Sequence, residues 1–81
     1  MQSGIRYNVT DSVSRRAIGH FLNRIYYEPA GSDSRLGHLD DQGGLVYYVV
    51  MPGDEPRVRG TYSDGALVRD DGFLFLVEPD A

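Results

Sequence analysis

The sequence predicts an α+β fold in which one N-terminal amphipathic helix packs on a largely antiparallel sheet of four to five strands, in the order β-α-β-β-β-β. Three observations predict this fold. Residues 12–27 place apolar side chains at helical spacing, residues 45–51 form an uncharged apolar run, and Asp-Gly pairs separate the apolar segments that follow. With 81 residues the chain can build one small core, so residues 1–81 are expected to form a single domain.

The first strand is predicted over residues 4–10, where apolar and polar side chains alternate. Ile5, Tyr7 and Val9 share one face, and the residues between them are polar. This period of two is typical of a strand that is buried on one side.

The helix is predicted over residues 12–27. At about 100° per residue, five apolar side chains fall in one broad arc: Ala17, Ile18, Phe21, Leu22 and Ile25. Asp11-Ser12 offers an N-cap for this helix. Because the residue before a proline disfavours helical dihedrals, Pro29 is expected to end the helix near Tyr27.

Residues 28–43 are interpreted as a long connecting loop, because glycine, serine and aspartate dominate them and no apolar period fits. Connections of this length are uncommon in small domains and are often functional or mobile. The loop leads directly into the most apolar part of the chain.

Residues 45–51 (Leu-Val-Tyr-Tyr-Val-Val-Met) are predicted to form the central strand, because they are apolar on both faces and carry no charge. A Gly-Gly pair precedes them and a Pro-Gly pair follows. Asp64-Gly65 and Asp71-Gly72 are strong hairpin signals, so the remaining strands should continue as an antiparallel meander. These strands are expected at Arg57–Tyr62, Ala66–Arg69 and Phe73–Glu78.

Charge is distributed unevenly along the chain. Residues 1–27 hold four arginines and one aspartate, a net charge of +3, whereas residues 28–81 hold four arginines and eleven acidic residues, a net charge of −7. This polarity favours charged partners. The sequence has no cysteine, no apolar stretch of membrane-spanning length and no apolar N-terminal stretch, so we expect no disulfide, no membrane contact and a cytoplasmic location.

No catalytic or cofactor-binding motif is present. The serines lack a Gly-x-Ser-x-Gly setting, and the glycines do not form a phosphate-binding loop. His20 and His38 lack the spacing of paired metal ligands and are interpreted as two unrelated surface residues. We therefore expect no enzymatic activity, no cofactor and no metal.

The acidic residues form the most coherent candidate binding set. Carboxylates held on rigid turns can imitate the phosphates of a nucleic acid and occupy the basic surface of a nucleic-acid-binding protein. The alternative is that aspartate simply favours turns. The acidic candidates are Asp40, Asp41, Asp54, Glu55, Asp70 and Asp71.

The arginine-bearing face of the predicted helix is a second candidate. Arg16 and Arg24 share this face with Tyr27, and arginine can neutralise phosphate while tyrosine stacks on bases. The protein would then be a small regulatory domain that binds nucleic acid directly. A third hypothesis, a self-associating structural module such as a homodimer, follows from the two apolar faces of the predicted sheet.

In size, single-domain organisation, acidic turns and lack of catalytic motifs, the chain resembles the small inhibitors encoded by phages and mobile elements, including anti-CRISPR proteins. The resemblance implies a stoichiometric inhibitor that blocks the DNA-binding surface of a nucleic-acid-binding effector. It would make the six acidic candidates contacts to arginine and lysine on that effector. An exposed tyrosine would then anchor the centre of the interface, as tyrosine often does: Tyr26, Tyr27, Tyr47 or Tyr62.

Overall fold

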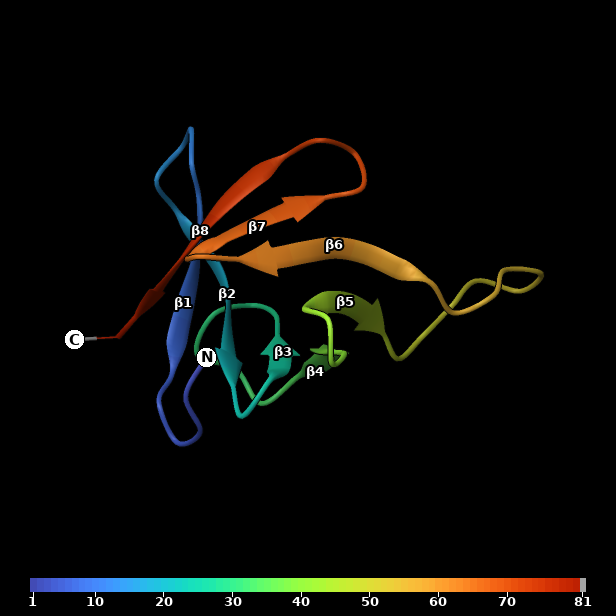
Figure 1. Ribbon diagram of the computed structural model, residues 1–81, viewed down its shortest axis with the longest axis horizontal. Helices are drawn as coiled ribbons and strands as arrows, with labels where there is room; N and C mark the ends of the chain where they lie inside the picture. Colours follow the sequence, from blue (N-terminus) through green and yellow to red (C-terminus); the bar gives the residue numbers. More distant parts are fainter. Residues whose placement is uncertain (81) are drawn as a thin grey trace.

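The protein forms a closed barrel of eight antiparallel strands, and the computed structural model describes residues 1–80 of the chain (Figure 1). The strands are β1 (Tyr7–Asp11), β2 (Ala17–Leu22), β3 (Ile25–Tyr27), β4 (Arg35–Leu39), β5 (Gly44–Tyr47), β6 (Val58–Ser63), β7 (Ala66–Arg69) and β8 (Leu74–Pro79). Each strand pairs with the next along the chain, and β8 pairs with β1 to close the barrel. The described residues contain no helix.

The prediction of an α+β fold with an N-terminal helix is wrong. Residues 12–27 form a turn followed by β2 and β3. Asn23 and Arg24 reverse the chain between these strands with φ angles of 53° and 66°, and Leu22 pairs with Ile25 across the turn. Two successive residues with positive φ suit a tight hairpin and are incompatible with a right-handed helix.

The misleading helical pattern arises because β2 buries side chains on both faces. Phe21 lies inside the barrel opposite Tyr7 on β1. Its neighbour His20 lies on the outer face, yet it is only 5% exposed, because the loop between β3 and β4 covers it. Burial on both faces removes the alternation of polar and apolar residues by which a strand is recognised.

Residues 28–43, expected to form one connecting loop, contain a strand. β4 pairs with β3 on one side and with β5 on the other. Its middle residue, Gly37, faces Tyr26 and Tyr47 on these neighbours. A glycine that permits close backbone approach in a strand looks like a loop residue when only composition is considered.

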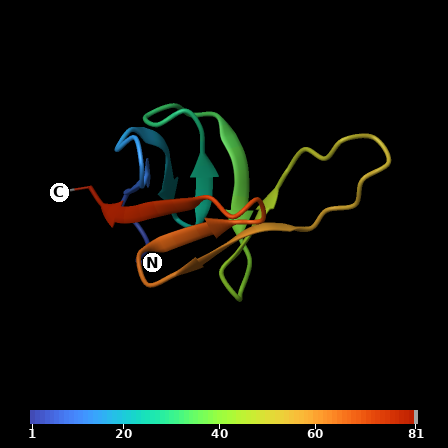
Figure 2. The same ribbon diagram turned by 90° about the horizontal axis from the view of Figure 1, so that it is seen from above.

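The apolar run of residues 45–51 is divided between the barrel and a projecting loop. β5 ends at Tyr47, and residues 48–57 project from the barrel as a loop that we call the arm (Figures 1 and 2). Leu45 is 1% exposed, whereas Val49 and Met51 on the arm are 82% and 69% exposed. The predicted central strand stops early because β4 begins at Arg35 and offers no pairing partner beyond Tyr48.

The predicted C-terminal meander is confirmed in β6, β7 and β8. The turn between β6 and β7 consists of Asp64 and Gly65, with φ angles of 49° and 78°, between the paired residues Ser63 and Ala66. Its geometry follows from the sequence alone, because Asp-Gly tolerates positive φ at both positions.

The hydrophobic core fills the interior of the barrel. Phe21, Leu45, Leu67 and Val9 are the largest fully buried side chains. The rings of Phe21 and Tyr26 lie 4.9 Å apart at an angle of 40°. The other core residues are Tyr7, Leu39, Phe75 and Val77.

Candidate interaction surfaces at the two rims of the barrel

The up-and-down order of the strands sorts the connections onto two rims. One rim carries the β2–β3, β4–β5 and β6–β7 turns together with the end of β8. The opposite rim carries the β1–β2 and β7–β8 turns, the ends of the β3–β4 loop, and the arm. Alternate turns of an antiparallel meander always emerge on the same side.

The first of these rims is rich in carboxylates, and we call it the acidic rim. Hydrogen bonds join its segments: Tyr62 N–H donates to the Gly43 carbonyl at 2.8 Å, and Val77 N–H donates to the Gly65 carbonyl at 2.8 Å. The acidic rim carries five carboxylates, from Asp40, Asp41, Asp64, Glu78 and Asp80.

Arginine compensates little of this charge. Arg24 lies in the β2–β3 turn, where its guanidinium donates to the backbone carbonyl of Asp40. Arg6 donates nothing to these carboxylates, and its guanidinium lies against Gly31 of the β3–β4 loop. None of the five carboxylates forms an ion pair among residues 1–80.

Asp40 shapes the acidic rim as well as charging it. Its Oδ1 accepts hydrogen bonds from the N–H groups of Gln42 at 2.9 Å and Gly44 at 2.7 Å. These two backbone donors hold the pKa of the Asp40 carboxyl below its usual value. Asp41 beside it, and Asp64 and Glu78 farther along the rim, are exposed to solvent.

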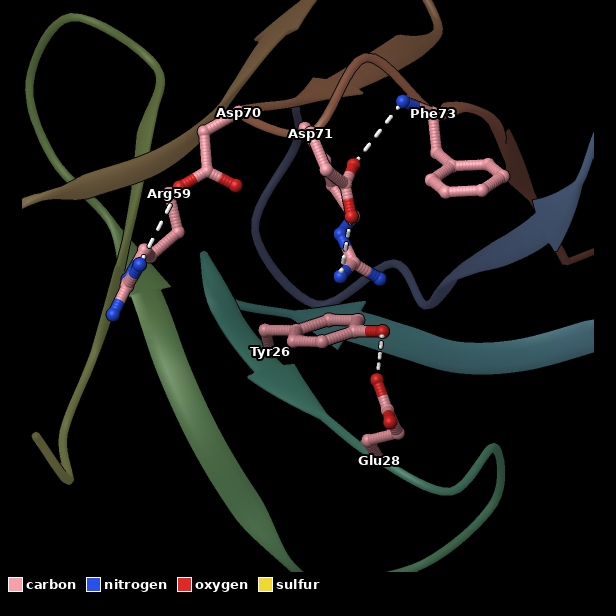
Figure 3. Close-up of polar contacts among 7 residues, drawn as sticks. Tyr26, Glu28, Arg59, Asp70, Asp71 and Phe73 are labelled. Atoms are coloured by element: carbon pink, nitrogen blue, oxygen red, sulfur yellow. Dashed lines mark hydrogen bonds and ion pairs between the residues drawn. The ribbon is translucent and has the colours of Figure 1, made fainter. Parts of the chain in front are cut away.

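On the opposite rim, by contrast, acidic and basic side chains are nearly balanced and partly paired. Arg59 lies 3.4 Å from Asp70, and Arg69 lies 3.0 Å from Asp71. Figure 3 shows Asp70 beside Arg59, and Asp71 accepting a hydrogen bond from the backbone N–H of Phe73. Seven carboxylates and six arginines lie in the connections and strand ends of this rim.

The structure separates the six acidic candidates. Asp40 and Asp41 lie on the acidic rim, whereas Asp54 and Glu55 lie near the tip of the arm. Asp70 and Asp71 lie with the arm on the opposite rim and are engaged by arginines. The six residues therefore do not form one surface. Asp64, Glu78 and Asp80, which complete the acidic rim, are recognisable only once the strand order is known.

The arginine-bearing helix face does not exist, because its residues lie on a turn and two strands. Arg16 lies in the β1–β2 turn and Arg24 in the β2–β3 turn, on opposite rims. Tyr27 lies on the outer face of β3, where its ring stacks on His20 with centroids 4.7 Å apart. The prediction of a nucleic-acid-binding face on a helix is therefore wrong.

The two histidines differ from the surface residues expected. His20 is buried, and its Nδ1 accepts a hydrogen bond from Gly31 N–H at 3.0 Å. Burial lowers the pKa of His20, the nearby Arg6 lowers it further, and Asp33 opposes this shift. His38 is half-buried and stacks on Tyr48 with centroids 5.4 Å apart.

A pH dependence of stability follows from His20. The pKa of His20 is lower in the folded protein than in the unfolded chain. The contribution of His20 to the free energy of unfolding is therefore fully present above its ordinary pKa of 6.5, and it decreases as the pH falls below that value. We expect His20→Asn, whose Oδ1 can take the place of Nδ1 as acceptor from Gly31, to remove this dependence. Urea unfolding at pH 7.5 and pH 5 measures it, and an equal pH dependence in both proteins would contradict the assignment.

Neither a pocket nor a metal-binding cluster of histidine and carboxylate side chains occurs among residues 1–80.

Tyr26 and Glu28 form the only side-chain hydrogen bond of a tyrosine to a carboxylate in this part of the chain, at 2.6 Å (Figure 3). Burial first, and this bond second, raise the pKa of Tyr26. No helix in the described residues is long and apolar enough to cross a membrane.

Comparisons with known proteins add no relative. No family model matches the chain, and neither the curated proteins nor the solved structures include a match.

Proposed function

We propose that the protein is a binding protein, not an enzyme, and that its acidic rim engages the basic surface of a nucleic-acid-binding protein. The observation that carries this proposal is the charge of the rim: among residues 1–80 its five carboxylates form no ion pair, four of these residues are exposed, and the guanidinium of one arginine, Arg24, bonds to the rim. The proposal includes a cytoplasmic location, where such partners act.

The barrel suits this task because it holds Asp40, Asp41 and Asp64 on short turns between paired strands, and Glu78 on β8 itself. A rigid backbone lowers the entropy lost when charged side chains dock, as in other preorganised binding surfaces. Unpaired exposed charges also steer a basic partner over distances comparable to the Debye length, which raises the association rate at low salt. A bound acidic rim would compete with nucleic acid for the same basic surface.

The first experiment captures partners on the tagged protein from a bacterial lysate, with and without nuclease treatment, and identifies them by mass spectrometry. A captured protein supports the proposal if it binds nucleic acid and if added DNA displaces it. The proposal would be contradicted by a captured protein that added DNA does not displace, or by the capture of nucleic acid alone.

Removing charge from the acidic rim is expected to weaken the captured complex. Asp41→Asn combined with Asp64→Asn should raise the dissociation constant about tenfold at low salt and reduce its salt dependence. Asp54→Asn combined with Glu55→Gln removes the same charge from the arm and serves as the matched control. Equal weakening by both pairs, measured by calorimetry, would show that net charge matters and that the acidic rim does not.

A further inference from the structure

Most of the exposed large apolar side chains among residues 1–80 lie in two parts of the molecule. Apart from Val58 on the outer face of β6, they lie either on the arm or around the β7–β8 hairpin. Eight large apolar side chains are between 43% and 87% exposed: Val13, Tyr48, Val49, Met51, Val58, Val68, Phe73 and Leu74. Concentrated exposure of this kind marks an interaction surface more often than scattered exposure does.

The first part of the arm, residues 48–51, is apolar, and its side chains Tyr48, Val49 and Met51 are exposed. Tyr48 N–H donates to the Leu36 carbonyl at 3.0 Å, and its ring stacks on His38. Beyond this point the arm leaves the barrel (Figures 1 and 2), and a turn bond from Asp54 N–H to the Met51 carbonyl closes its tip. Uncharged, β-branched segments with unpaired backbone tend to associate.

The second apolar area, which we call the hairpin patch, consists of Val13, Val68, Phe73 and Leu74. Val68 pairs with Leu74 across β7 and β8, on the face opposite the buried pair of Leu67 and Phe75. Ser12 N–H donates to the Leu74 carbonyl at 3.4 Å, which brings the β1–β2 turn with its 87% exposed Val13 beside the patch.

Charged side chains lie next to the apolar side chains in both areas. In the arm, the apolar residues 48–51 are followed by Asp54 and Glu55 near the tip. Beside the patch, Arg15 and Arg16 in the β1–β2 turn are exposed and form no ion pair among the described residues. The apolar residues 48–51 and the acidic tip of the arm are thus complementary to the apolar hairpin patch and the basic β1–β2 turn.

We propose that two copies of this chain associate by placing the arm of each across the hairpin patch of the other. Tyr48, Val49 and Met51 would cover the patch, and the acidic tip would meet Arg15 and Arg16. Such a contact is two-fold symmetric and closes at two copies. Pro52 and Pro56 flank the arm tip and oppose the continued strand pairing that would produce fibres.

Electrostatics also favours a second copy over other occupants. The opposite rim is nearly balanced in charge, so two copies can approach through it while their acidic rims remain apart. The carboxylates of Asp54 and Glu55 would be repelled by nucleic acid and by an anionic membrane. Asp70 and Asp71 border the patch near Phe73, so the acidic tip should point away from them toward the β1–β2 turn.

Sedimentation equilibrium of the isolated protein tests the proposal directly. We expect a monomer–dimer equilibrium, with Val49→Ser combined with Met51→Ser raising the dissociation constant at least about tenfold. Val49→Ile combined with Met51→Leu keeps the arm apolar and should leave the dimer intact. A monomer at all concentrations would overturn the proposal, as would a dimer insensitive to the serine variant.

A charge exchange tests which surfaces meet. Asp54→Arg with Glu55→Arg should weaken the dimer, and so should Arg15→Glu with Arg16→Glu. The four substitutions together should restore it, because the attraction is re-formed with the signs reversed. Additive weakening would overturn the assigned contact, and so would binding of the monomeric protein to anionic lipid vesicles through an intact arm.

Discussion

Replacing Phe21 with alanine should lower the free energy of unfolding by about 4 kcal/mol, the loss typical of a large aromatic side chain removed from a packed core. Phe21 is 0% exposed and lies on β2 opposite Tyr7. Its ring also packs against Tyr26, 4.9 Å away on β3. The truncation would therefore leave a cavity between three neighbouring strands that cannot collapse without breaking their pairing.

Phe73→Ala is the matched control for this prediction. Phe73 lies in the β7–β8 turn and is 60% exposed, so the same truncation should change the free energy of unfolding by about 0.5 kcal/mol or less. Urea titrations monitored by circular dichroism, at a concentration where the protein is monomeric, give both values. Equal losses for the two variants would contradict the barrel, in which these phenylalanines occupy opposite environments.

Gly37→Ala should also destabilise the protein strongly, by about 3 kcal/mol, because the new methyl group has no room. A Cβ at this position would collide with the Val46 carbonyl oxygen and would lie 3.1 Å from the Tyr47 Cα atom. Both obstacles are backbone atoms of β5, which is held by its ladders to β4 and β6. Relief requires a displacement of the strand, and a side-chain rotation would not suffice.

Gly53→Ala separates this steric effect from the general cost of replacing glycine. Gly53 lies on the arm with a φ of 89° and nothing within 4 Å of the position of a Cβ. Its replacement should cost only the strain of a left-handed backbone, about 1 kcal/mol. Denaturant midpoints measure both variants. A loss at Gly37 no greater than at Gly53 would show that β4 and β5 are not closely packed.

Local turn chemistry explains why the C-terminal strands were predictable. Asp64-Gly65 adopts the two positive φ angles of a tight hairpin wherever apolar segments flank it, because this preference depends only on the two residues themselves. The turn fixes the register in which the two flanking strands pair. Expected and observed strands agree at β7 in both bounds and at β6 and β8 within one residue.

The N-terminal error has a different origin. The same spacing of apolar side chains between Ala17 and Ile25 fits one face of a helix and both faces of a strand. The outer face of β2 is buried only because the β3–β4 loop folds over His20, which is a contact between residues 20 and 31. The turn signal at Asn23-Arg24 is weak, since arginine rarely adopts positive φ.

The candidate surfaces also combine features that depend on local sequence with features that depend on the fold. The sequence by itself determined the charges, the tight turns and the apolar character of residues 45–51, because these depend on residue type and near neighbours. Only the tertiary structure decided that Asp41 and Asp64 share a rim, that Asp54 lies on the opposite rim, and that the arm leaves the sheet after Tyr47. The strand order imposes these positions, because alternate turns of an antiparallel meander emerge on the same rim, and the number of strands between two turns is fixed only in the folded barrel.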